Sequence, residues 1–213
     1  MASPFRLCVS GSEAPHPGRL TPRQGGADDR AWWFVAGAVY LPLMVGSWAW
    51  FAWDGGVGAV IELQLGPRPV WDAVLGLVLG GLASAASRWG ARRWRWMADM
   101  ADALGAQLGP LAPLTTLVLA VCSGLGEEWL FRGVILQSWG QVASVVLFAL
   151  AHTSPDPALR AWPVLALAMG AVFVALAVWT GGLMAPVVLH ITVNALNLRW
   201  LVERHQRQSL PRG

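Results

Sequence analysis

The stretch LAPLTTLVLAVCSGLGEEWLFRGVILQ, residues 111–137, decides the fold class of this chain. It is apolar over more than the roughly 20 residues that a helix needs to cross a bilayer, yet Glu127, Glu128 and Arg132 lie inside it. Charged side chains within a membrane are energetically costly, so those that occur there usually serve a function. The stretch therefore predicts a membrane-spanning helix that carries a polar site.

Other apolar runs of similar length lie on both sides of this stretch. Four of them are long enough to span a membrane, and a fifth is short. They are residues 31–53, 70–89, 162–179 and 183–200, with 141–152 as the short one. The pattern predicts an all-α protein, a polytopic transmembrane helical bundle with about six membrane helices.

The charges of the chain are distributed as in a membrane protein. Of the 213 residues, 55% are hydrophobic and only 13% are charged, against roughly 25% charged in a soluble domain. All 15 basic residues are arginine, and 11 of them cluster at the borders of the apolar runs, in residues 19–30, 88–95 and 199–212. The positive-inside rule assigns these clusters, with Arg160, to the cytoplasmic side. We expect an integral, multi-pass protein of the cell inner (plasma) membrane with both termini in the cytoplasm.

The composition also excludes several classes of protein. The apolar content is too high for a mainly disordered chain. Cys8 lies in a polar tail and Cys122 in an apolar run, so the two cysteines form no disulfide framework. The arginines do not line one polar face, and nothing else in the chain favours a nucleic-acid partner.

The chain divides into four segments. Residues 1–29 are rich in Pro, Gly and Ser and are predicted to be a disordered tail. Residues 30–109 are predicted to form a transmembrane hairpin, with a Gly-rich polar connector at 55–69, followed by an interfacial segment in which Arg and Trp alternate. Small residues at Gly76, Gly80 and Ser84 would let neighbouring helices approach closely. Residues 110–203 carry the buried ionisable groups, and 204–213 are predicted to be a basic C-terminal tail.

The spacing of the ionisable residues predicts the helix face on which each side chain lies. Glu128 and Arg132 are four residues apart, so they share a helix face and can pair. Glu127 is rotated by about 100° from its neighbour, so its carboxylate points elsewhere. The same four-residue spacing relates His190 to Asn194 and Phe148 to His152.

Helix geometry also places these groups at similar depths. A rise of 1.5 Å per residue puts Glu127 about 15 Å and His152 about 20 Å below the outer surface. His190 and Asn194 lie about 10 Å and 16 Å deep by the same rise. Three helices thus bring polar groups toward one shared cavity. Each group also has a structural interpretation: a buried ion pair for Glu128–Arg132, helix capping for His152, and helix-to-helix bonding for His190 and Asn194.

A carboxylate, two imidazoles and an amide are the groups that activate a water and stabilise an oxyanion. No serine has a neighbouring histidine, and neither G-x-S-x-G, a phosphate loop nor H-E-x-x-H occurs. A zinc ion held by Glu127, His152 and His190, with Asn194 behind them, stays open as an alternative.

Three short motifs occur in order: E-E-x-x-x-R at Glu127–Arg132, F-x-x-x-H at Phe148–His152 and H-x-x-x-N at His190–Asn194. Together they resemble the CPBP family of intramembrane proteases, named for CAAX proteases and bacteriocin-processing enzymes and also called Abi. The resemblance covers about residues 113–198, so segment 110–203 is identified as a CPBP-like protease core.

The resemblance implies an intramembrane endopeptidase of the glutamic type. It assigns Glu127 and His152 to water activation, and His190 and Asn194 to the oxyanion hole. Glu128, Arg132 and Phe148 would support them. No metal cofactor is expected, because glutamate, histidine and asparagine suffice; Zn²⁺ bound by Glu127, His152 and His190 is the mechanistic alternative.

The expected partners are the lipid bilayer and a membrane-associated peptide or protein substrate, cleaved as by CAAX proteases or by bacteriocin-processing and immunity enzymes. Two other functions remain open. One is a non-catalytic membrane immunity or scaffold protein with the same fold. The other is a small transporter whose polar residues carry protons.

Overall fold

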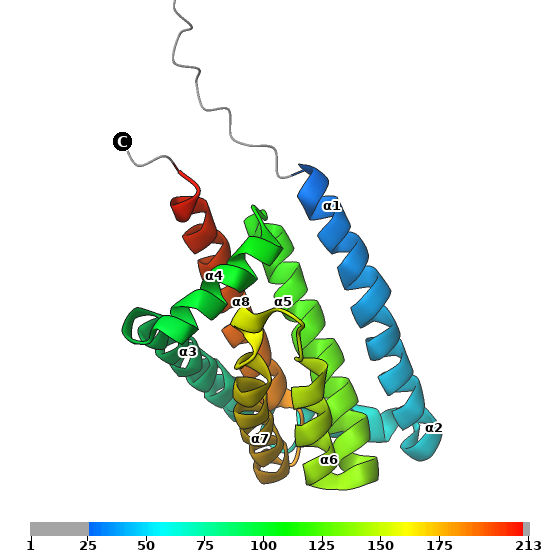
Figure 1. Cartoon of the computed structure of the whole chain (residues 1–213). Helices are drawn as coiled ribbons and strands as arrows, with labels where there is room; N and C mark the ends of the chain where they lie inside the picture. Colours follow the sequence, from blue (N-terminus) through cyan, green and yellow to red (C-terminus); the bar gives the residue numbers. More distant parts are fainter. Residues whose placement is uncertain (1–25, 211–213) are drawn as a thin grey trace, which may run out of the picture.

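The computed structural model describes residues 26–210, which fold into a bundle of helices with no β-strand in that range (Figure 1). The predicted all-α fold class is confirmed. The α-helices are α1 (Gly26–Val35), α2 (Leu41–Leu65), α3 (Pro69–Arg93), α4 (Arg95–Leu108), α5 (Pro113–Glu128), α6 (Leu136–Ala151), α7 (Trp162–Thr180) and α8 (Met184–Gln208). The shorter segments are the π-helical η1 (Ala36–Tyr40) and η2 (Trp129–Ile135) and the 3-10 turn η3 (Pro157–Leu159). The predicted disordered tail, residues 1–29, lies outside the described residues except for its last four, which begin α1.

Among residues 26–210, 5 helical segments are long and apolar enough to cross a membrane. They are Asp29–Trp53, Pro69–Arg93, Pro113–Ala151, Pro157–Thr180 and Met184–Gln208. The short apolar run 141–152, which the expectation of about six helices counted separately, is the second arm of Pro113–Ala151 and has about half the length of a span. The bundle is otherwise the predicted one.

The chain reverses direction at Gly140, which has φ +82° and ψ −179°. Ser144 Oγ donates a hydrogen bond of 2.7 Å to the carbonyl oxygen of Phe131. In a straight helix, the 13-residue separation of these two residues would place them about 20 Å apart. The second arm of the segment therefore folds back on the first, so that its end, at His152, returns to the level of Glu127.

The predicted polar connector at 55–69 is mostly helical. The helix α2 is interrupted at Gly56, where φ is +75°, and then continues to Leu65. This part of α2 braces the core: Leu183 N donates to Leu63 O over 2.8 Å, and Trp129 Nε1 donates to Gln64 Oε1. The sequence predicted a connector because the Gly and polar residues of 55–69 disfavour a helix. Hydrogen bonds from other helices to this segment stabilise the helix in the folded protein.

The small residues of α3 pack directly on α8, as predicted. A Cβ atom built on Gly76 would lie 2.5 Å from the carbonyl oxygen of Ala185. A Cβ atom on Gly80 would lie 2.7 Å from Cβ of Thr192. The third member of the face, Ser84, donates a 2.7 Å hydrogen bond to Oδ1 of Asn197. Glycine at these positions therefore allows α8, which carries two of the candidate site residues, to lie against α3.

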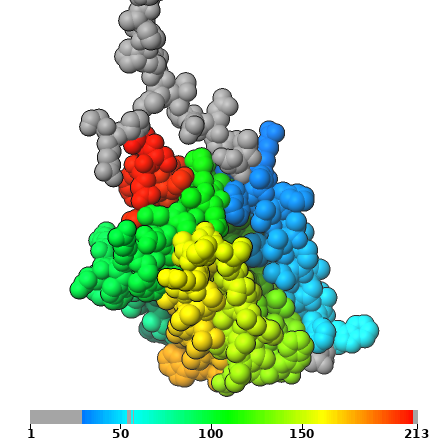
Figure 2. Space-filling model, in the orientation of Figure 1, coloured from blue at the N-terminus to red at the C-terminus, as the bar shows by residue number. Residues whose placement is uncertain are grey.

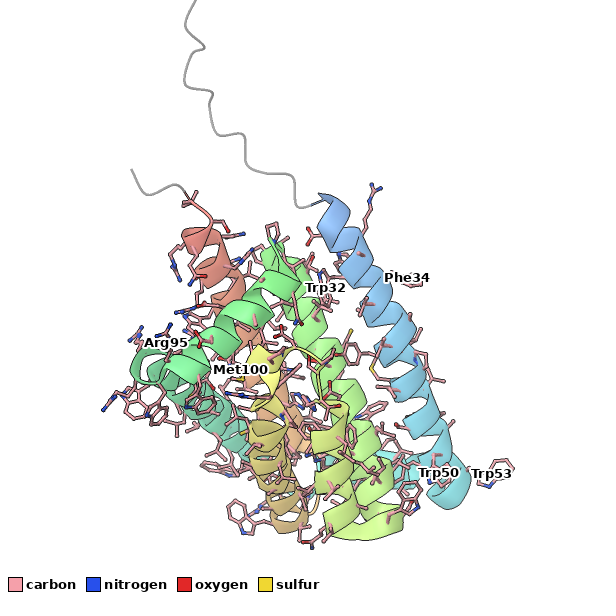
Figure 3. All side chains as sticks on the ribbon, in the orientation of Figure 1. Trp32, Phe34, Trp50, Trp53, Arg95 and Met100 are labelled. Atoms are coloured by element: carbon pink, nitrogen blue, oxygen red, sulfur yellow. The ribbon has the colours of Figure 1, made fainter. Side chains whose placement is uncertain are left out.

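The predicted interfacial segment forms the end of α3 and the helix α4, which crosses one end of the bundle (Figure 1). Figure 3 shows Arg95 at the outer corner and Met100 facing the bundle, and Met100 is buried. The helix α8 extends to Gln208, so the first half of segment 204–213 is helical rather than a tail. Arg204 explains this extension, because its Nη2 donates to Asp102 Oδ2 of α4 over 3.1 Å.

Large apolar side chains cover the outside of the bundle. The segment α1–α2 forms one edge of the molecule (Figure 2). Phe34 and Trp53, exposed by 76% and 93%, point away from the bundle, whereas Trp32 packs inward (Figure 3). Such a surface would be unfavourable in water, but in a bilayer it faces lipid.

Candidate active site

Glu128 and Arg132 form the buried ion pair that their spacing predicts. Both side chains are 0% exposed, and Arg132 Nη1 lies 3.1 Å from Glu128 Oε1. The other end of the guanidinium donates to the carbonyl oxygen of Gly170 on α7 over 3.1 Å. Its carbon also lies 4.3 Å from the ring centroid of Phe148 and 4.8 Å from that of Phe173. Arg132 thus joins α6 and α7 to the segment that carries the glutamates.

His190 is attached to the same carboxylate. Its Nδ1 lies 2.7 Å from Glu128 Oε1, although the two residues are 62 positions apart. The imidazole also stacks on Phe173, with ring centroids 4.9 Å apart and planes inclined by 14°. Because a carboxylate accepts, Nδ1 carries the proton. Glu128 therefore orients His190 so that its Nε2 points toward Glu127.

His152 is oriented by the backbone of its own helix. Its Nδ1 lies 2.7 Å from the carbonyl oxygen of Phe148, which is the residue four positions earlier. A carbonyl oxygen can only accept, so the Nδ1–H form is assigned and Nε2 of the neutral ring carries a lone pair. This nitrogen also points toward Glu127.

Glu127 lies where the two imidazoles meet. Its Oε2 is 3.9 Å from His152 Nε2 and 3.9 Å from His190 Nε2. That oxygen is buried and has no hydrogen-bond partner among residues 26–210. The structure thus brings together three of the predicted catalytic residues from α5, α6 and α8 around one carboxylate oxygen.

Asn194, the fourth predicted catalytic residue, lies one turn beyond His190 on α8. Its Nδ2 donates a 2.9 Å hydrogen bond to Ser123 Oγ on α5. Ser123 was not predicted from the sequence, although it lies four residues before Glu127 and so shares its helix face. That spacing was the signal that could have identified it.

Tyr40 is a second residue that the sequence analysis missed. It ends the π-helical segment η1, and its ring packs on Gly126, where an added Cβ would lie 3.3 Å from Tyr40 Cδ1. Its hydroxyl lies close to the carboxylate of Glu127. Pro42 follows and has no N–H to donate, so the helix loses one bond where η1 widens. Single π-helical turns are frequent at functional sites.

The site adjoins a cavity of about 530 Å³. His152, His190 and Asn194 line one part of it, and tryptophans at the junction of α3 and α4 line another. These tryptophans are Trp89, Trp94 and Trp96, and each is exposed by more than 40%. The cavity therefore extends from the candidate site to the surface of the molecule beside the arginines of residues 88–95.

A metal ion does not fit the side chains as they stand. No group of three His, Cys, Asp or Glu residues within the described part of the chain is arranged to hold one. Zinc bonds of about 2.0–2.1 Å would bring donor atoms closer together than the 3.9 Å that separates Glu127 Oε2 from each imidazole.

A comparison with protein families finds a match over the part of the chain that carries the site. Residues 109–196 match the family described as Rce1-like, type II CAAX prenyl endopeptidase Rce1-like. This segment is similar to the CAAX-protease family. The resemblance inferred from the three motifs is thus confirmed, and the match includes every motif residue from Glu127 to Asn194. The matched segment begins just after α4, so α1–α4 lie outside it. No curated protein and no solved structure gives a match.

Proposed function

We propose that this chain is an intramembrane endopeptidase in which Glu127 and His152 activate the attacking water. The observation that carries the proposal is the convergence of two imidazole Nε2 atoms on Glu127 Oε2, a buried oxygen without a hydrogen-bond partner in the described residues. A purely structural cluster would be expected to pair that oxygen, because an unpaired buried acceptor is destabilising. An unpaired, buried Glu127 Oε2 beside two imidazoles is instead the arrangement expected of a group that accepts a proton during catalysis.

The attack uses two acceptors. A water seated between Glu127 Oε2 and His152 Nε2 donates one proton toward each, because both atoms present lone pairs. As the water oxygen bonds to the scissile carbonyl carbon, Glu127 takes one of its protons. His152 holds the other, and Phe148 O fixes the ring through Nδ1.

The next steps need hydrogen-bond donors. The carbonyl oxygen becomes an oxyanion, which His190 Nε2–H and the Asn194 amide stabilise from α8. Donation from Nε2 requires the doubly protonated ring, in which Nδ1–H still points at Glu128. When the C–N bond breaks, the proton on Glu127 passes to the leaving nitrogen. One water is consumed, and an acid and an amine are formed.

The substrate class follows from the cavity and the family. The cavity is lined mainly by apolar and aromatic groups, such as Phe173 and Met169, and it reaches the surface beside the tryptophans. This suits a peptide segment that approaches from the membrane with an apolar group attached. The family description names prenylated CAAX tails, and a bacteriocin-processing type of peptide is the alternative.

A cleavage assay in liposomes tests the proposal. The purified chain is incubated with membrane-associated peptides, with and without an apolar anchor, and the products are identified by mass. Wild type is expected to cleave, and so is the control variant Glu62→Gln, which changes an exposed glutamate of α2. Glu127→Gln is expected to be inactive.

Two results would contradict this function. If Glu127→Gln cleaves as fast as wild type, Glu127 has no part in the chemistry. If wild type cleaves none of the peptides, the alternative becomes the better one: a non-catalytic membrane immunity or scaffold protein, for which the buried network around Arg132 is purely structural.

A further inference from the structure

The hydrogen bond between Ser123 and Asn194 has a defined direction. Ser123 is 5% exposed and lies on α5, with its Oγ 2.9 Å from Asn194 Nδ2 and 3.2 Å from the carbonyl oxygen of Ala120. A serine hydroxyl has one proton, and a carbonyl oxygen can only accept. The proton is therefore committed to Ala120, so Ser123 Oγ must accept from the amide. Only the N–H end of the Asn194 amide can make this bond.

The backbones around the bond are held close together. A Cβ atom on Gly124 would lie 2.5 Å from Cγ1 of Ile191 and 3.0 Å from its backbone nitrogen. The helices α5 and α8 are thus in direct contact beside the Ser123–Asn194 bond. Two helices packed this closely move little relative to each other. Ser123 therefore stays in place and holds the side-chain amide of Asn194 in one orientation.

A second serine–asparagine pair, between α3 and α8, has a hydrogen bond of the opposite direction. Ser84 Oγ donates a 2.7 Å hydrogen bond to Oδ1 of Asn197. Ser84 is as buried as Ser123, at 1% exposure, and Asn197 also lines the cavity. The Ser123–Asn194 pair includes a residue of the H-x-x-x-N motif, and the Ser84–Asn197 pair does not. The Ser84–Asn197 pair therefore provides a matched control.

We propose that Ser123 is a positioning residue for the oxyanion hole. By accepting one Nδ2–H of Asn194, it excludes the flipped amide, in which Oδ1 would face the negatively charged oxygen. The second Nδ2–H is then available to the oxyanion. This inference rests on the proposed peptidase function, and it adds a residue that none of the three motifs contains.

Kinetics of paired variants test the inference. Removing an oxyanion-hole donor costs about 10²–10³ in kcat, and losing only its orientation should cost a part of that, about tenfold. Ser123→Ala is expected to lower kcat about tenfold with little change in KM. Ser84→Ala, which removes an equivalent buried bond, is expected to leave kcat within about twofold. In an Asn194→Ala background, Ser123→Ala should have no further effect, because the two residues act as a unit.

An NMR experiment tests the contact without relying on activity. Asn194 and Asn197 are the only asparagines in the sequence, so labelling asparagine with ¹⁵N gives signals from just two side-chain amides. Ser123→Ala should shift the Asn194 amide protons and speed their exchange with solvent, while the Asn197 pair stays unchanged. Ser84→Ala should do the reverse.

The outcomes are distinguishable. An unchanged Asn194 amide in Ser123→Ala overturns the inference whether or not the chain is active. So does a kcat within twofold of wild type, or a loss that persists in the Asn194→Ala background. If wild type cleaves nothing, the catalytic role of Ser123 is rejected together with the proposed function, and the amide signal decides only whether Ser123 holds Asn194.

Discussion

Two adjacent glutamates have opposite surroundings because a helix turns by about 100° per residue. Oε1 of Glu128 contacts both Arg132 and His190, at 3.1 Å and 2.7 Å. Oε2 of Glu127 has imidazole nitrogens at 3.9 Å and no hydrogen bond. Glu128 thus holds the site together, and Glu127 is left as the group that can take a proton.

Replacing Glu127 by Gln is expected to separate activity from stability. The amide keeps the shape of the carboxyl group and removes its basicity, and it breaks no ion pair at hydrogen-bonding distance. We expect Glu127→Gln to express normally, to melt within about 1 kcal/mol of wild type and to be inactive. Thermal melts in detergent together with turnover measure both properties.

Replacing Glu128 by Gln is expected to destabilise the protein. Arg132, which is 0% exposed, would lose its counter-charge, and breaking a buried pair from one side costs about 3–5 kcal/mol. Glu128→Gln should therefore express poorly or melt early, with partial activity in the folded fraction. A variant as stable as wild type would show that the ion pair does not support the fold.

Metal removal tests the remaining mechanistic alternative. If Glu127 and His152 activate the water without a metal, chelators should leave turnover unchanged, and purified protein should contain no stoichiometric zinc. One zinc ion per chain, lost and restored together with activity, would instead indicate that Glu127, His152 and His190 are ligands.

The contact between α3 and α8 fixes the position of the helix that carries His190 and Asn194. A Cβ atom on Gly80 would lie 2.9 Å from the carbonyl oxygen of Leu189, whereas nothing lies within 4 Å of one on Gly81. Gly80→Ala should therefore destabilise the bundle by about 1–3 kcal/mol through overpacking and lower turnover, because α8 carries His190. Gly81→Ala should be neutral or slightly stabilising. Equal melting temperatures of the two variants would contradict this packing.

The hydrogen-bonded ion pair between Asp102 of α4 and Arg204 of α8 makes the stability of the protein depend on pH. The hydrogen bond from Arg204 holds the pKa of Asp102 below its ordinary value of 3.8, and Gln208 adds a second bond. A lowered folded-state pKa contributes stability above the ordinary value, and that contribution is lost as the pH falls through the lowered one. Because the Asp102 side chain is 37% exposed, the contribution should be below about 1 kcal/mol.

Melts of wild type and Asp102→Asn measure this contribution. The two should differ from neutral pH down to about 4 and converge at lower pH. Asp99→Asn, an exposed change on the same helix, should match wild type throughout. A difference between wild type and Asp102→Asn that persists at the lowest pH would assign it to packing rather than to charge.

At the scale of the molecule, the arginines of the three clusters that the structure describes, at 30, 88–95 and 199–207, gather at one end. The start of α1, the whole of α4 and the end of α8 lie together there (Figure 1). The turn η3, which precedes Arg160, contacts α4 and belongs to the same end. The positive-inside rule therefore predicts that this end faces the cytoplasm, with both termini.

Cysteine labelling tests that orientation. Arg92 and Arg68 are exposed near opposite ends of α3, a helix long enough to cross the bilayer. After Cys8 and Cys122 are replaced, a cysteine introduced by Arg92→Cys should react from the cytoplasmic side and one introduced by Arg68→Cys from the other side. The reverse pattern would invert the topology.

Relationships within one helix could be predicted from the sequence. The pairing of Glu128 with Arg132, the separate direction of Glu127 and the break near Gly140 follow from helix periodicity and glycine geometry, which are local properties. The apolar runs likewise determine which segments are membrane helices, because bilayer thickness sets their length.

Relationships between helices were decided only by the tertiary structure. The bonds from His190 to Glu128 and from Asn194 to Ser123 join residues 62 and 71 positions apart. The second half of α2 and the last turns of α8 are helical because Trp129 and Asp102 on other helices bind their polar side chains. Such contacts depend on how closely glycines such as Gly76 and Gly124 let two backbones approach. That distance is set by the packing of the whole bundle, and no local spacing in the sequence encodes it.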